Sequence, residues 1–368
     1  VASFFGWSFY HRQQGPVSLA APGTTVASVM SGVSNGALVH QAMPKGKDAL
    51  RWALITAATV MIMVLMIVLC FGSIRGCHKV QTCVVAFEAE NVKTQLNGYA
   101  IVGLSTAFVL ELVSLHFSYE SARPVLGLVN GLDNTFMPPV LLCVTLFVLI
   151  LENLIFFSST PWFANASAAG LPVYTSIYVE WLINVPILLV LAGCCALNRS
   201  SDEVARPLLV TNIYIVFAWS AHFISDPTLR WSLVFATFFM YFCASKDMVS
   251  WAQAYKNDTD PDVSGTHLRQ ASTLGLVAFF GLYGLVYLSR LTNVINEYQE
   301  RVWYLCMNIT TKLIMLMLFG GIRSSRYHDL IVNMLVNTHF SFRRQVAVMD
   351  PEHAGNGEED LYKQLLDS

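Results

Sequence analysis

The chain of 368 residues is 55% hydrophobic, carries charge on only 12% of its residues and has a mean hydropathy of +0.52. Globular domains average about 25% charged residues, so this composition does not cover a water-soluble surface of this size. It also excludes an intrinsically disordered chain, which needs low hydrophobicity and high charge. A formal net charge of −2 without a long basic run argues against nucleic acid as a partner. The composition predicts an integral membrane protein in contact with lipid.

Eight apolar stretches are long enough to cross a bilayer as helices. A hydrocarbon core of about 30 Å needs about 20 residues at a rise of about 1.5 Å each. The turn around Asp226-Pro227 is all that separates the fifth stretch from the sixth. The sequence therefore predicts an all-α integral membrane protein with eight spans. The predicted spans are 52–72, 99–117, 139–157, 173–195, 208–225, 230–250, 273–289 and 302–322.

Basic residues are distributed unevenly between the two sets of loops. With both termini in the cytoplasm, 15 of the 22 Lys and Arg residues fall on the cytoplasmic side, six fall outside and Lys312 lies in the last span. This bias satisfies the positive-inside rule and predicts cytoplasmic termini, in a protein of the plasma membrane. In an outer loop, an oxidising environment would permit a disulfide between Cys77 and Cys83. Asn165-Ala166-Ser167 is either a glycosylation site or a chance sequence match.

Composition divides the chain into four parts. Residues 1–50 are rich in Gly, Ser, Ala and Pro and predict a flexible cytoplasmic arm. Residues 51–97 contain the first span and an outer loop, and residues 98–323 contain the other seven spans. The cytoplasmic tail, 324–368, is expected to hold a partly amphipathic helix over 329–346.

Four ionisable side chains lie inside the predicted spans, where charge is costly: Glu111, Glu152, Glu180 and Lys312. Lys312 is too deep to reach the membrane surface with its side chain. A buried lysine must pair with a carboxylate, lose its proton or be used covalently. Two interpretations follow: a structural ion pair in a receptor-like or transporter-like protein, or an amine that condenses with an aldehyde. Glu180, followed by the bulky Trp181, is the natural partner of opposite charge.

These residues form a recognisable pattern. Tyr178-Val179-Glu180-Trp181 with Pro186, and Asn308 four residues before Lys312, resemble the third and seventh helices of microbial rhodopsins. The resemblance covers about residues 98–325 and implies the seven-helix rhodopsin bundle, here with one extra N-terminal transmembrane helix. It implies all-trans retinal bound to Lys312 as a protonated Schiff base, with Glu180 as the counterion.

The resemblance also implies which other side chains surround the retinal. Aromatic residues on the seventh predicted span stand where the family places Trp, Tyr and Trp, and a tryptophan at the start of the sixth matches one on the family's fifth helix. The residues expected to bind the cofactor are Lys312, Glu180, Trp181, Asn184, Pro186, Phe280, Tyr283, Tyr287, Asn308 and Trp231.

The same comparison bears on what light does in this protein. Ile177 and Leu191 stand where a proton pump has a basic residue and a proton donor, which disfavours pumping. The extra span resembles the opsin units of enzyme rhodopsins and of rhodopsin–bestrophin fusions. The sequence therefore predicts a light receptor, not itself an enzyme, that signals to a cytoplasmic partner or effector domain and forms a homo-oligomer.

A light-gated channel resembling the channelrhodopsins is the alternative. Polar and acidic side chains inside or beside the spans would then line a hydrated path. The candidate path residues are Glu152, Asn153, Glu111 and Glu300.

Overall fold

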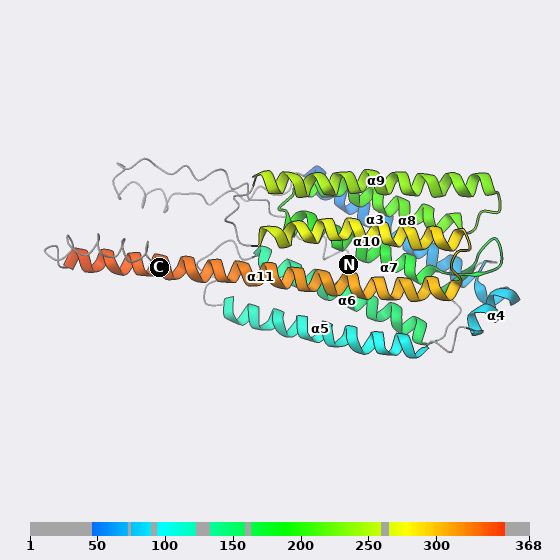
Figure 1. The fold of residues 1–368 in the computed structure, drawn as a ribbon, viewed down its shortest axis with the longest axis horizontal. Coiled ribbons are helices and arrows are strands. Elements are labelled where there is room, and N and C mark those ends of the chain that lie inside the picture. The colour runs from blue at the N-terminus through cyan, green and yellow to red at the C-terminus, as the bar shows by residue number, and fades with distance from the viewer. Residues whose placement is uncertain are drawn as a thin grey trace.

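The computed structural model describes residues 46–72, 75–89, 94–122, 133–158, 163–258 and 265–349. Within these ranges eight helices are long and apolar enough to cross a membrane, which confirms the predicted number of spans and the all-α membrane class (Figure 1). Most of the predicted N-terminal arm, and the end of the tail after residue 349, lie outside the described residues.

The spanning helices lie side by side, and consecutive ones run in opposite directions. In chain order they are α3 (Gly46–Gly72), α5 (Thr94–Ala122), α6 (Asp133–Phe157), α7 (Thr175–Val190) continued by a π-helical segment η4 (Leu191–Ala196), α8 (Ser201–Ala221), α9 (Pro227–Asp258), α10 (Thr266–Leu291) and α11 (Glu297–Met349). The short elements are η1 (Cys77–Lys79), α4 (Gln81–Ala89) and the antiparallel strands β1 (Ala164–Ala166) and β2 (Pro172–Tyr174).

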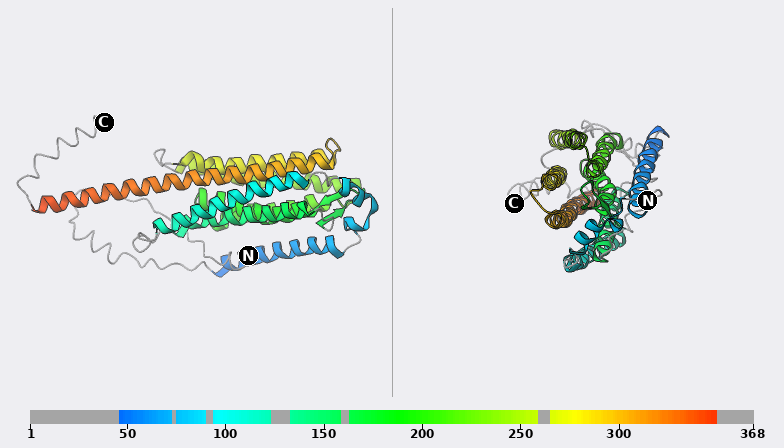
Figure 2. Two further views of the ribbon diagram at one scale, coloured as in Figure 1. Left: turned by 90° about the horizontal axis from the view of Figure 1, so that it is seen from below. Right: turned by 90° about the vertical axis from the view of Figure 1, so that its right-hand side faces the viewer.

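The two ends of the bundle differ. The β1–β2 hairpin, η1 and α4 gather at one end, which we call the hairpin end (Figure 2). At the opposite end, the tail end, α11 continues past all the other helices (Figure 1). The span of α7 is the most enclosed, with 72% of it buried, whereas only 11% of the span of α3 is buried. The predicted extra helix therefore packs on the outside of the bundle, against α7 and α8.

Local sequence signals explain where the helices around the site begin. The Ser200 hydroxyl caps α8 by accepting a hydrogen bond from the backbone N–H of Glu203 at 3.3 Å. The carboxylate of Asp226 accepts the backbone N–H of Thr228 at 2.7 Å, and Pro227 occupies the first turn of α9. The short break between the fifth and sixth predicted spans is thus a helix start with its own cap.

The predicted tail helix is part of a longer one. The sequence predicts a partly amphipathic helix over 329–346, and these residues are helical within α11, a single helix of 53 residues that crosses the membrane region and continues to Met349. No Gly or Pro interrupts residues 322–349, so nothing in the sequence ends the helix where the span ends. The tail is therefore a direct extension of the helix that carries Lys312.

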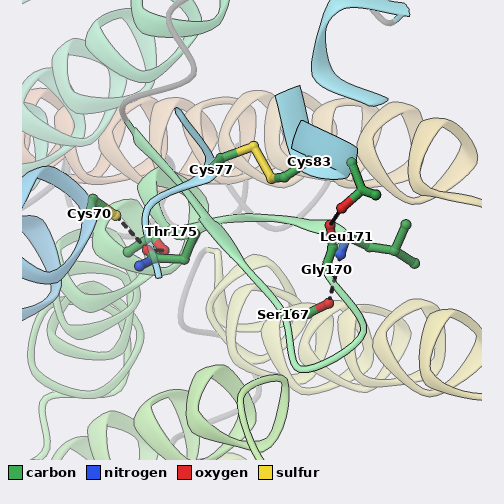
Figure 3. Close-up of a disulfide and its surroundings, with 9 residues drawn as sticks. Cys70, Cys77, Cys83, Ser167, Gly170, Leu171 and Thr175 are labelled. Atoms are coloured by element: carbon green, nitrogen blue, oxygen red, sulfur yellow. Dashed lines mark hydrogen bonds between the residues drawn. A yellow bond between two sulfur atoms is a disulfide. The ribbon is translucent and has the colours of Figure 1, made fainter. Parts of the chain in front are cut away.

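The hairpin end is fastened by buried contacts. Cys77 and Cys83 form the disulfide that the sequence permitted (Figure 3). The side chain of Asn165 is only 1% exposed; it accepts hydrogen bonds from Cys70 Sγ at 2.6 Å and Thr175 Oγ1 at 2.5 Å. Its amide also donates to the carbonyl of Leu69 at 3.3 Å. Because Asn165 is enclosed and engaged, the glycosylation interpretation is wrong for this fold, and Asn165 instead ties α3 to the start of α7.

Candidate functional site

The centre of the bundle holds a buried ion pair between α7 and α11. Lys312 Nζ lies 2.8 Å from Glu180 Oε1, and the two side chains are only 4% and 1% exposed. Each group compensates the charge of the other, which is the condition under which a charge persists in an apolar interior. The structure therefore brings together the two residues that the sequence singled out as partners.

Amide side chains complete the surroundings of this pair. Asn308, one turn before Lys312 on α11, accepts a hydrogen bond from Lys312 Nζ at 3.3 Å and another from the Tyr283 hydroxyl at 2.5 Å. Asn184, one turn after Glu180 on α7, donates to Glu180 Oε1 and to the backbone carbonyl of Thr145 on α6 at 3.3 Å. Four helices thus fix the positions of the carboxylate and the amine.

An apolar cavity opens beside Lys312, between α7, α8, α9, α10 and α11. It holds about 710 Å³ of space free of protein atoms, part of it open to the surroundings. Aromatic rings dominate its walls, and Lys312 and Asn308 supply polar groups in its lining. Its lining comprises Trp181, Val185, Leu188, Tyr214, Ile215, Ala218, Thr237, Phe238, Tyr241, Phe280, Tyr283, Gly284, Tyr287, Asn308, Thr311 and Lys312.

Trp181 links the ion pair to this cavity. Its ring meets those of Tyr283 and Tyr304 edge to face, with centroids 5.3 and 5.1 Å away. Tyr287 is fixed by its hydroxyl, which donates to the carbonyl of Ala218 on α8 at 3.0 Å. Such edge-to-face contacts restrain the rings, so the walls of the cavity are held in place.

Four of the predicted cofactor residues do not line the cavity. Glu180 and Asn184 lie at the polar contacts around Lys312 instead. Trp231 is 41% exposed and lies near the start of α9, beside Pro227 and Phe235. The turns of α9 that face the cavity are deeper and carry Thr237, Phe238 and Tyr241. Pro186 is buried within α7 but is not part of the cavity wall.

Sequence reasoning missed several residues of the cavity wall. Tyr214 on α8 and Phe238 and Tyr241 on α9 line it, and their spacing of three residues on α9 was visible in the sequence. That signal was ambiguous, because the same span carries Phe235, Phe239 and Phe242, which point outward.

The four predicted path residues lie in three different places. Glu152 and Asn153 are buried on α6. Glu111 on α5 pairs with Arg323 on α11, with N–O distances of 2.8 and 3.0 Å, eleven residues beyond Lys312 toward the tail end. Glu300 pairs with Arg290 at 3.3 Å at the hairpin end.

A second, more polar cavity lies at the hairpin end of the bundle, and its lining includes residues of α7 and α11. Tyr178 and His222 line it and share a hydrogen bond of 2.9 Å between the tyrosine hydroxyl and the imidazole Nε2. Burial of the imidazole, together with the positive charges of Arg290 and Arg230, lowers the pKa of His222 to about 3. His222 is therefore a neutral hydrogen-bond partner at ordinary pH.

The comparisons identify this arrangement. Residues 128–324, more than half of the chain, match the family described as bacteriorhodopsin-like protein. The chain belongs to this family. It is accordingly a retinal-binding, light-responsive membrane protein of the microbial rhodopsin type. No curated protein sequence matches it.

Solved structures of microbial rhodopsins share the fold. The transmembrane domain and linker region of the Salpingoeca rosetta rhodopsin phosphodiesterase superposes with a TM-score of 0.61 at 14% identity, covering 87% of this chain and 98% of that one. The transmembrane domain alone gives a TM-score of 0.57 at 14% identity and covers 73% and 97%. Thermophilic rhodopsin from Rubrobacter xylanophilus gives 0.52 at 15% identity and covers 64% and 96%.

The cavity fits the chromophore that the family implies. A polyene needs a slot with flat apolar walls, and the aromatic lining provides one. Two polar atoms of the lining, Trp181 Nε1 and Thr311 Oγ1, are buried without a partner among the described residues. Lys312 belongs to the same lining, and its amine is within reach of a ligand aldehyde.

Proposed function

We propose that this rhodopsin binds all-trans retinal through Lys312 as a protonated Schiff base, with Glu180 as the counterion. The observation that carries the proposal is the 2.8 Å contact between Lys312 and Glu180 beside the aromatic cavity. When bound, retinal supplies a polyene that absorbs visible light and changes shape when it does so.

The residues of the chain have distinct tasks in this proposal. Glu180 holds the proton on the Lys312 nitrogen, because its negative charge stabilises the positive one in a site with little water. Asn308 orients that nitrogen by accepting its hydrogen bond, and Tyr283 in turn holds Asn308. Asn184 donates to the carboxylate and keeps Glu180 facing Lys312.

A sensor is the output we favour. Displacing the charge of Lys312 from Glu180 changes the energy of a buried ion pair by several kcal/mol, enough to shift a two-state bundle by orders of magnitude. Lys312 lies on α11, which continues as one helix to Met349 beyond the tail end. A rotation or tilt of α11 in the bundle is therefore transmitted to its extension, where a cytoplasmic partner or effector domain would respond.

Two features support this choice. Leu188 and Leu189 on α7 and Leu191 on η4 are buried and apolar, so these positions supply no proton donor toward the tail end, which disfavours pumping. The similar Salpingoeca rosetta protein is a rhodopsin phosphodiesterase whose structure includes a linker region. We further propose cytoplasmic termini, residence in the plasma membrane and a homo-oligomeric state, in keeping with the charge bias and the extended helix.

A light-gated channel is the second candidate. The buried polar side chains of α6, Glu152 and Asn153, lie on the side of the ion pair away from the aromatic cavity, where a hydrated path would run. A channel needs this path to continue to the tail end during illumination.

The binding proposal is tested with cells that express the chain and receive all-trans retinal. We expect a visible pigment in the wild type and in Lys256→Ala, which removes an exposed lysine at the end of α9. We expect none in Lys312→Ala, because no other amine lines the cavity among the described residues. A coloured Lys312→Ala variant would end the proposal.

The output is tested by whole-cell current under illumination. Pigmented cells without a light-dependent current support the sensor. A current whose reversal potential follows one ion gradient overturns the sensor and establishes the channel.

A further inference from the structure

Helices α6 and α7 are aligned by two contacts that fix their register. Near the middle of the bundle, Asn184 on α7 donates to the carbonyl of Thr145 on α6. Near the hairpin end, the rings of Tyr174 and Phe156 meet at 5.4 Å. Thr145 and Phe156 are 11 residues apart on α6, and Asn184 on α7 is ten residues from Tyr174, which directly precedes α7, so the two antiparallel helices stay in register between the contacts.

The register places Glu152 close to Glu180. At about 1.5 Å per residue, Glu180 lies about 6 Å from the Asn184 level toward the hairpin end, and Glu152 lies about 10 Å from the Thr145 level in the same direction. The two carboxyl groups are therefore about one helical turn apart along the bundle. Glu152 is only 6% exposed, and it experiences the charges of Glu180, Lys312 and Arg301.

Several buried polar atoms between these helices have no hydrogen-bond partner among the described residues. Three of them are acceptors: Glu180 Oε2, Asn184 Oδ1 and Asn153 Oδ1. The hydroxyl of Ser176, at about the level of Asn153, is also without a partner there. Buried polar atoms are nearly always satisfied, and acceptors require donors. The donors that fit such a site are internal water and a carboxylic acid that carries its proton.

Charge balance points to the same acid. Lys312 and Glu180 already neutralise each other, so a second carboxylate beside them would leave a buried charge uncompensated. Arg301 lies farther out, with its guanidinium 4.3 Å from the centre of the Phe156 ring and 5.4 Å from that of Tyr174. Arg301 therefore marks the hairpin end of the series of polar groups.

We propose that Glu152 carries a proton and, through internal water, donates a hydrogen bond to Glu180 Oε2. Glu180, Glu152, Asn153 and Ser176 then form a polar file from the Lys312 nitrogen to Arg301. This inference rests on the proposed function, and it adds a path for protons between the Lys312 nitrogen and the hairpin end.

The file conducts one proton without a net change in its own groups. After illumination, the Lys312 nitrogen gives its proton to Glu180. Glu152 releases its proton to water near Arg301 and takes up the one on Glu180, which becomes a carboxylate again. The nitrogen has then lost one proton, and one proton has appeared at the hairpin end. Reprotonation of the nitrogen reverses these steps along the same file, so the proposed cycle moves no net proton across the membrane.

Infrared difference spectroscopy of the pigmented full chain, light minus dark, tests the role of Glu152. We expect a band in the carbonyl region of protonated carboxylic acids that shifts in heavy water. Glu152→Gln should remove this band and slow light-induced proton release, followed with a pH-indicating dye, at least tenfold. Glu152→Asp should restore a band at a shifted position. Glu111→Gln, which alters another buried glutamate, should leave the band and the release rate unchanged.

The possible failures are distinguishable. A wild-type pigment without the band, or a Glu152→Gln pigment that keeps both the band and the release rate, overturns the file and leaves the retinal site intact. Absence of any pigment in the wild type overturns the proposed function itself. If Glu152→Gln does not assemble, the shifted band of Glu152→Asp decides, because an unshifted band in that variant assigns the signal to another acid.

Discussion

Replacing Glu180 with glutamine removes one charge from the buried pair and leaves the size of the side chain unchanged. At the observed 2.8 Å, two unit charges interact by about 6 kcal/mol at an effective dielectric constant of about 20. Loss of one partner of a buried pair typically costs about 3–5 kcal/mol, because the other charge is left buried without compensation. Asn308 and Asn184 are neutral and do not replace the lost charge.

This energy appears directly in the titration of the pigment. The protonated Lys312 nitrogen is destabilised by the full amount, and one pH unit corresponds to about 1.4 kcal/mol. We therefore expect the visible colour of Glu180→Gln to disappear at a pH about 2 to 4 units lower than in the wild type. Between those two pH values, the variant should absorb only in the ultraviolet while the wild type stays coloured.

The measurement is an absorption spectrum of purified pigment across a pH series. Glu111→Gln is the matched control, because it removes the charge of a buried, paired glutamate eleven residues of α11 away from the site. Its titration should coincide with that of the wild type. An unchanged titration midpoint and absorption maximum in Glu180→Gln would refute the counterion assignment. It would also show that the 2.8 Å contact does not stabilise the protonated Lys312 nitrogen.

Three further outcomes follow from the structure. Asn308→Asp places a negative charge beside the Lys312 nitrogen and should move the absorption maximum to shorter wavelength; a move to longer wavelength contradicts this placement. Neutralising either Glu111 or Arg323 alone should lower the free energy of unfolding by about 3–5 kcal/mol, but neutralising both should cost much less than the sum, as thermal melts will show; additive losses would mean that the pair is not coupled. Because the pKa of folded His222 is about 3 and that of an unfolded histidine is about 6.5, the unfolded chain binds a proton between these values that the folded chain does not. Stability should therefore fall as pH drops from about 6.5 to 3, by at most about 1.4 kcal/mol per unit, and His222→Gln should show a flatter profile; equal slopes would refute the assignment.

Much of the site was readable from the sequence because charge in an apolar span is rare and must be compensated. Glu180 and Lys312 are of opposite sign in two different spans, and pairing them satisfies both. The aromatic positions of α10 could likewise be predicted, since Phe280, Tyr283 and Tyr287 all line the cavity. Residues three and four apart share one face of a helix, so when one of these residues lines the cavity the other two do as well.

Two sequence patterns acquire a different setting in the structure. Trp231 matches a family tryptophan on α9, but the face of α9 that meets the cavity carries Phe238 and Tyr241. Asn165 matched a glycosylation pattern, yet three contacts from residues distant in sequence enclose it. In both cases the residue matches a local sequence pattern, but its environment is set by residues that are distant in the sequence.

The sequence by itself determined the eight helices, because hydropathy and length are properties of each segment alone and the bilayer acts on each segment separately. It also predicted a helix over 329–346, and the structure makes this helix part of α11, since no Gly or Pro interrupts residues 322–349. Only the tertiary structure decided which face of each helix meets protein and which meets lipid. Both environments are apolar, so a span such as α9 carries aromatic residues on all sides. The hydrophobicity of its inward face therefore differs little from that of its lipid-facing side. For the same reason the partner of Glu111, Arg323 at a separation of 212 residues, and the contacts that set the register of α6 against α7 emerge only when the helices are packed together.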